Sequence, residues 1–124
     1  MLYLQVDRPD FVVSQLQSLF TSLADATDES TAPGSTGCLR PDTVAVMWDT
    51  YGRFPTDVGC FSPLLLNHMV LEPGECCYYA AQELHAYLSG ECVECVGCSN
   101  NTIRAGLTPK FIDREALVEV LNYR

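Results

Sequence analysis

Residues 71–95 read LEPGECCYYAAQELHAYLSGECVEC, and this stretch decides the fold class that the sequence predicts. Short runs of aliphatic and aromatic residues alternate with turn signals at Pro73-Gly74 and Ser89-Gly90. Runs of this kind between turn residues are typical of β-strands joined by tight turns. With its flanks, the pattern predicts strands near residues 64–71, 75–80, 84–88 and 91–97. We therefore expect a mainly β fold here, an antiparallel barrel or sandwich.

Helical patterns stand on both sides of the predicted strands. Apolar residues recur at helical spacing in residues 10–24 and from Val44 to Tyr51. Between these two helices, residues 25–37 are acidic, small and rich in turn residues, which predicts a flexible linker. The tail DREALVEVLNYR has helical spacing, with Asp113 as a candidate cap. The predicted organisation is a helical segment over residues 1–53 and a β domain with a terminal helix over residues 54–124.

Composition narrows the function classes. The 124 residues are enough for one domain with a core, and the net charge of −9 repels polyanions, which argues against a nucleic-acid partner. No apolar run is long enough to cross a membrane. The seven cysteines are an odd number, and the first residues, MLYLQVDRPD, lack a signal peptide's basic and apolar regions. These features predict a soluble, cytoplasmic protein and do not indicate its oligomeric state.

Three cysteines raise the possibility of a metal centre. Cys92, Cys95 and Cys98 have the C-x2-C-x2-C spacing of iron–sulfur or zinc ligands. On a strand at 91–97, however, residues three apart point to opposite faces, so they could not share one ion. We therefore favour small buried apolar residues for these positions. A cysteine-ligated metal protein is kept as an alternative.

The histidine of the opening stretch is a second metal candidate. A lone histidine beside an apolar run is more often a hydrogen-bonded core residue, and His68 is interpreted in that way. His85, however, starts a strand after a strand, turn and strand, which suits a metal-facing position inside a small barrel. Tyr87 shares its face, and Glu94 follows across the Ser89-Gly90 turn. These three side chains are therefore expected near one another.

From about Phe54 to Tyr123, the motifs FPTDVG, HAYLSG, ECVEC and SNNTIRAGLTPKF occur in an order and spacing that closely resemble one family. The family is type I mannose-6-phosphate isomerase (phosphomannose isomerase), and the resemblance is to its C-terminal part. That family is built on a cupin fold with a helical insertion. The resemblance therefore implies a cupin-type, jelly-roll-like antiparallel barrel after the helical segment.

The resemblance also implies a site. The family's zinc is held by a glutamine, two histidines and a glutamate, and the histidine of HAY makes His85 a zinc ligand. The arginine of RAGLTPK makes Arg104 the active-site residue, while Lys110, the only lysine, Tyr87 and Glu94 resemble pocket residues. We assign Glu94 as proton carrier, and Lys110 and Tyr87 to the substrate. The three further zinc ligands are expected outside this chain.

The implied reaction suits these residue types. Interconverting mannose 6-phosphate and fructose 6-phosphate, which supplies mannose for GDP-mannose synthesis, moves a proton between C1 and C2. Zinc can polarise the sugar oxygens, and Arg104 or Lys110 can meet the phosphate or the developing enediolate. The expected partner is thus a small sugar phosphate. On charge alone, the alternative for both basic residues is a solvated patch.

Two departures from the family pattern affect the prediction. Leu84 and Gln82 stand where the family usually has proline and asparagine, so the loop that presents His85 is expected to differ in shape. One zinc ligand of four is too few for tight binding, so we expect a fragment of the enzyme that binds zinc weakly and isomerises little. The alternative is a non-catalytic cupin module that binds sugar phosphates.

Overall fold

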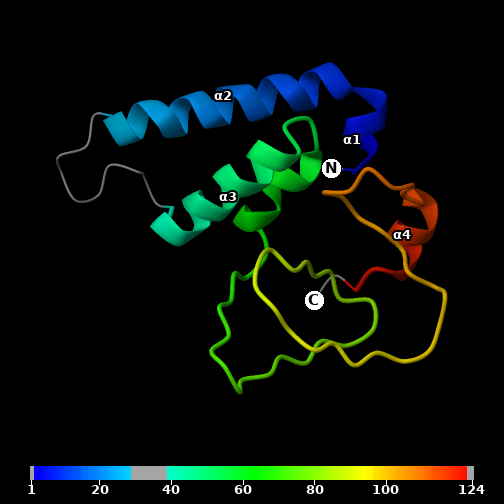
Figure 1. Ribbon diagram of the computed structural model, residues 1–124. Coiled ribbons are helices and arrows are strands. Elements are labelled where there is room, and N and C mark those ends of the chain that lie inside the picture. Colours follow the sequence, from blue (N-terminus) through cyan, green and yellow to red (C-terminus); the bar gives the residue numbers. More distant parts are fainter. Residues whose placement is uncertain (1, 29–38, 123–124) are drawn as a thin grey trace.

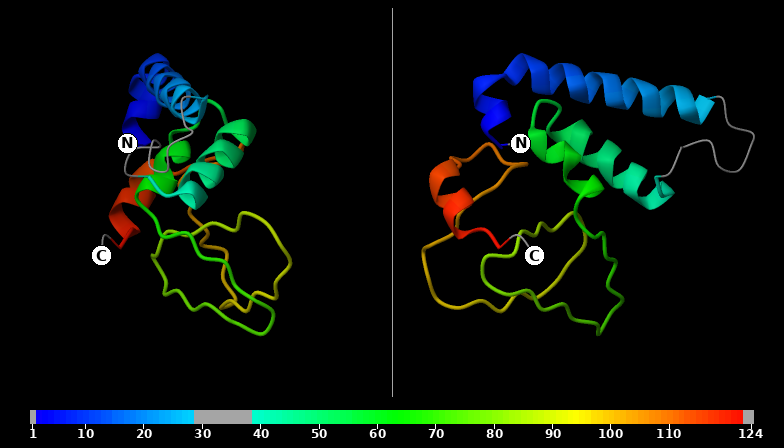
Figure 2. Two further views of the ribbon diagram at one scale, coloured as in Figure 1. Left: turned by 90° about the vertical axis from the view of Figure 1, so that its left-hand side faces the viewer. Right: turned by 180° about the vertical axis from the view of Figure 1, so that it is seen from behind.

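Two long helices packed against each other form the ordered centre of the protein, shown in Figure 1. The computed structural model describes residues 2–28 and 39–122. The helices are α1 (Leu2–Asp7), α2 (Pro9–Asp28), α3 (Pro41–Arg53), the 3-10 helix η1 (Val58–Leu64) and α4 (Arg114–Val120). Figures 1 and 2 show α2 beside α3, while the chain between η1 and α4 runs in wide loops on the side of α3 away from α2.

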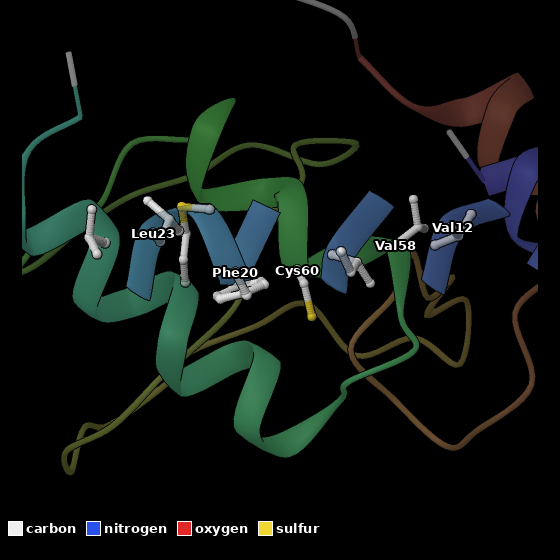
Figure 3. Close-up of a cluster of buried hydrophobic side chains, with 8 residues drawn as sticks. Val12, Phe20, Leu23, Val58 and Cys60 are labelled. Atoms are coloured by element: carbon white, nitrogen blue, oxygen red, sulfur yellow. The ribbon is translucent and has the colours of Figure 1, made fainter. Parts of the chain in front are cut away.

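The core lies where α2, α3 and η1 meet. Its buried side chains are Val12, Leu16, Phe20, Leu23, Val44, Met47, Val58 and Cys60. The four from α2 are spaced by four, four and three residues, which places them on one face of a helix. Figure 3 shows this face meeting Val58 and Cys60. Burial of each large apolar side chain contributes about 1.5–3 kcal/mol, so this face holds α2 in place.

The helices predicted from spacing are confirmed, with one change of length. α3 spans Pro41–Arg53, and its first turn carries Pro41 and Asp42, residues that suit the start of a helix. α4 is capped as expected, since the Asp113 carboxylate accepts the Ala116 N–H at 3.0 Å. α2 continues through residues 25–28, where the linker was predicted to start, and residues 29–37 of that linker lie outside the described residues.

The predicted β-barrel is wrong, because residues 2–28 and 39–122 contain no strand. The four stretches predicted as strands are irregular apart from Leu64, which ends η1. The cupin-type barrel implied by the resemblance is therefore absent from the described residues. Their backbone bonds are local turns, such as Glu75 N–H to the Glu72 carbonyl at 3.0 Å. Strand propensity measures how well a side chain suits a half-buried pleated surface. Here Tyr78 is 89% exposed and Val93 is 99% exposed, so no second layer rewards pairing.

A loop bond ties the tail to the segment before His85. The Asn122 N–H donates to the Gln82 carbonyl at 2.9 Å, and Gln82 has a φ of +69°. This left-handed conformation is uncommon for glutamine and easier for asparagine. Glutamine in place of the family's asparagine at position 82 therefore costs conformational free energy in the loop that presents His85.

Among the described helices, none has the length and apolar character needed to span a bilayer.

Cys60 is expected to resist thiol reagents in the folded protein. It is fully buried, its Sγ lies 3.1 Å from the Phe54 carbonyl oxygen, and burial, with the nearby Asp57 carboxylate, raises its pKa to about 11. At pH 8 the thiol therefore stays protonated and unreactive. Alkylation with iodoacetamide followed by peptide mass mapping should modify the exposed Cys76, Cys77 and Cys92 and spare Cys60 until urea is added. Rapid alkylation of Cys60 in the folded protein would contradict its burial in the core.

Candidate functional site

Four side chains from three successive loop segments meet in one cluster, which we call the tyrosine cluster: Tyr79, His85, Tyr87 and Glu94. The Glu94 Oε1 accepts from the hydroxyls of Tyr79 at 2.9 Å and Tyr87 at 2.8 Å. The two tyrosine hydroxyls also contact each other, and because each has one proton, two of these three contacts can be donated hydrogen bonds at a time. The His85 ring lies against the Tyr79 ring, with centroids 3.7 Å apart and planes tilted by 31°. The expected proximity of His85, Tyr87 and Glu94 is therefore observed.

The backbone sets the orientation of the His85 ring. Its Nδ1 lies 2.9 Å from the Glu83 carbonyl, an acceptor, so Nδ1 carries the proton and donates. The neutral ring then presents Nε2 as a free electron-pair donor. Tyr87 meets the same ring edge-on, with centroids 6.0 Å apart. Packing on two sides and one hydrogen bond thus leave Nε2 available for a metal ion.

His85 offers one nitrogen donor of a kind that suits zinc. In the two described ranges, no group of three or more histidine, cysteine or acidic side chains could hold a metal ion. Cys92, Cys95 and Cys98 are exposed, which corrects the expectation that they are buried on a strand. The argument from opposite strand faces also falls, since 91–97 is not a strand. Within the described residues, then, His85 supplies one coordination position.

Hydrogen bonds set the charge of the cluster. The bonds from Tyr87 and Tyr79 lower the pKa of Glu94, so it is a carboxylate near neutral pH. The bond with Tyr79 and the bond to Glu94 raise the pKa of Tyr87, which stays a protonated donor. Glu94 is thus ionised, and the two phenol bonds make it a weaker base than a free glutamate.

Arg104 and Lys110, the other predicted site residues, lie on a separate loop. Arg104 is half-buried and Lys110 is exposed, with its backbone N–H donating to Thr108 Oγ1 at 3.2 Å. Over residues 2–28 and 39–122, no hydrogen bond or ion pair joins either side chain to the tyrosine cluster. The structure therefore brings together three of the five predicted site residues and leaves the two basic ones apart.

The loop that carries Arg104 is held by a buried carboxylate that sequence reasoning missed. Asp57 is 7% exposed, and its Oδ2 accepts the Leu107 N–H at 2.9 Å while its Oδ1 accepts the Gly59 N–H at 2.7 Å. A β-carbon on Gly59 would lie 2.7 Å from Leu107 Cγ, so glycine is needed there. The motifs FPTDVG and RAGLTPK are thus joined through one side chain.

Comparison with known proteins finds relatives for part of this chain. It is 56% identical over 71 residues to mannose-6-phosphate isomerase from Rattus norvegicus, which covers 57% of this chain and 17% of that protein. Identity is 59% over 70 residues with the probable mannose-6-phosphate isomerase of Caenorhabditis elegans, or 56% of this chain and 17% of the relative. With the Homo sapiens mannose-6-phosphate isomerase it is 55% over 71 residues, 57% of this chain and 17% of the relative.

Two other comparisons gave no match: no family model and no solved structure matches the chain. The matched stretches span less than a fifth of the length of these three relatives. The chain is thus consistent with a fragment of such a protein. The resemblance predicted from the motifs is confirmed, because curated relatives that are 55–59% identical over 70–71 residues are named mannose-6-phosphate isomerase, one of them as probable.

Proposed function

We propose that this chain supplies part of the active site of a mannose-6-phosphate isomerase. The observation that carries the proposal is the identity of 55–59% over 70–71 residues with proteins of that name. The tyrosine cluster adds support, because His85, Tyr87 and Glu94, which belong to the motifs of the resemblance, lie together in it. The substrate is then a sugar phosphate, and the product enters GDP-mannose synthesis. The exposed free thiols suit the reducing cytoplasm.

In this proposal His85 gives one nitrogen to zinc and Glu94 handles the proton. Nε2 of His85 is the donor left free by the Nδ1 bond to Glu83. Zinc, when bound, polarises the oxygens of the sugar. Glu94, which is ionised near neutral pH, accepts the proton that leaves C1 or C2 of the sugar. Tyr87 stays protonated and donates to that carboxylate, which orients its oxygens.

In this proposal the loop that carries Arg104 and Lys110 binds the phosphate group of the substrate. Arg104 carries a fixed charge whose planar guanidinium can bind two phosphate or enediolate oxygens at once, and Lys110 adds an exposed point charge. Both belong to a chain of net charge −9, so an anionic ligand depends on such local positive groups. Asp57 fixes the backbone of this loop at Leu107, which limits where Arg104 can lie.

A second function is binding of sugar phosphates without isomerisation. The observation that favours it is that no group of three or more histidine, cysteine or acidic side chains in the described residues could hold a metal ion. Arg104 and Lys110 could still hold a phosphate in the absence of the metal.

Binding of mannose 6-phosphate, measured by calorimetry with and without ZnCl2, tests both functions beside an isomerisation assay. Arg104→Ala is expected to weaken binding at least tenfold, since a charged hydrogen bond contributes about 1.5–3 kcal/mol. The matched control is Arg40→Ala, whose guanidinium pairs with Asp42 on the exposed surface of α3. Zinc-dependent turnover that is lost in His85→Ala would support the isomerase. Binding without turnover would favour the second function for this chain, and the absence of binding by the folded chain would contradict the phosphate-binding role that both functions give to Arg104.

A further inference from the structure

Tyr79 contacts all three other members of the tyrosine cluster, although the proposed function gives it no role. Its ring lies on His85 at 3.7 Å between centroids, and its hydroxyl donates to Glu94 Oε1 at 2.9 Å and contacts the Tyr87 hydroxyl. One side chain thus touches the proposed zinc ligand, the proposed proton carrier and the proposed substrate residue. None of the motifs pointed to it.

We propose that Tyr79 is a positioning residue for this site, with its ring holding the His85 imidazole and its hydroxyl holding the Glu94 carboxylate. The inference rests on the proposed functions of His85 and Glu94. Tyr79 acts through these two groups and need not touch the substrate. Its two halves have separable tasks, because the ring contacts His85 and the hydroxyl contacts Glu94.

Apart from the Tyr87 contacts and the Nδ1 bond to Glu83, the loops give His85 and Glu94 little other support. The three segments that meet here have no sheet to fix their register, since the described chain contains no strand. His85 and Glu94 are both exposed, whereas Tyr79 is half-buried. A side chain that is anchored more deeply than the groups it contacts can limit their motion. Residues around a ligand commonly orient it in this way, and their loss typically weakens metal affinity 10–100-fold.

The neighbouring tyrosine shows that position, and not residue type, makes the difference. Tyr78 is 89% exposed and takes no part in the tyrosine cluster. It provides a matched control, because Tyr78→Leu removes the same atoms one residue away. The second histidine, His68, is also exposed and lies outside the cluster. It therefore serves as an internal reference for His85 in any spectrum of the two imidazoles.

Imidazole NMR spectra of the full chain at one fixed pH test the proposal without any metal. In the native protein, the His85 ring protons are expected upfield of those of His68, because they lie over an aromatic ring. Tyr79→Phe should keep this shift, and Tyr79→Leu should abolish it. Both variants should change the side-chain carboxyl signal of Glu94, since both lose the hydroxyl. Tyr78→Leu should change neither signal.

Titration with ZnCl2, followed on the His85 signals, completes the test. Tyr79→Leu is expected to weaken zinc binding at least tenfold, with Tyr79→Phe close to the native chain. Unchanged His85 and Glu94 signals in Tyr79→Leu would overturn the positioning role, whatever zinc does. If those signals move but neither zinc nor mannose 6-phosphate perturbs His85 in the native chain, the contacts stand and the proposed function falls. Circular dichroism of each variant separates these results from unfolding.

Discussion

Phe20→Ala is expected to lower the free energy of unfolding by about 3–5 kcal/mol, as for other buried aromatic residues. Phe20 is 3% exposed on α2, and its ring stacks on Tyr51 of α3 with centroids 4.0 Å apart. Trp48 meets it edge-on at 4.8 Å. Such aromatic pairs contribute about 0.5–1.5 kcal/mol beyond the area they bury. Both partners are fixed on α3, so the neighbours cannot close the cavity. Urea unfolding followed by circular dichroism measures the loss.

The matched control is Phe11→Ala on the same helix. Phe11 is 42% exposed, and its ring receives the Arg8 guanidinium at 5.4 Å, an exposed contact that contributes about 0.5–1 kcal/mol. We expect the control to lose at most about 1 kcal/mol, since Phe11 is already partly in water and leaves no closed cavity when it is shortened. Equal losses in the two variants would mean that the face of α2 shown in Figure 3 does not form the core.

The helices could be predicted because their signals are local. The spacing of Val12, Leu16, Phe20 and Leu23 describes the buried face of α2, and Asp113 marks the start of α4 by its own side-chain bond. The periodicity and the cap both act within a few residues of chain. Nothing distant has to be known for them to hold.

The strands were predicted wrongly because pairing is not local. Residues such as Val93 and Tyr78 suit a pleated surface, but a sheet forms only when another segment completes the ladder and a second layer covers one face. Both are fully or nearly fully exposed here. The sequence pattern indicates how well each segment suits a strand. It does not indicate whether another segment lies beside it to pair with.

The site was predictable where its contacts are local and was missed where they are not. The Ser89-Gly90 turn returns the chain, with Gly90 at a φ of +103°, so Glu94 comes back to Tyr87 and His85 without any strand. Tyr79 was missed because nothing in the Tyr78-Tyr79 pair tells the half-buried residue from the exposed one. Asp57 had a weak signal, a carboxylate two residues before glycine, but its bond to Leu107 spans 50 positions.

Asp57→Asn is expected to lower the free energy of unfolding by about 2–3 kcal/mol, the cost of leaving a buried donor without a charged acceptor. The carboxylate accepts two backbone N–H groups, from Gly59 at 2.7 Å and Leu107 at 2.9 Å. An amide has one oxygen, so one N–H would face the NH2 group instead. Asp49→Asn is the control, since its exposed pair with Arg53 contributes at most about 1 kcal/mol.

The same change should loosen the loop that carries Arg104. Leu107 lies three residues after Arg104, so releasing its N–H frees the backbone that places the guanidinium. We expect faster amide hydrogen exchange at Leu107 and weaker binding of mannose 6-phosphate in Asp57→Asn. Because Asp57 would act on the ligand through Arg104, adding Arg104→Ala should cost less affinity than the two single losses combined. Fully additive losses, or an unchanged Leu107 exchange rate, would mean that Asp57 holds the fold together without placing Arg104.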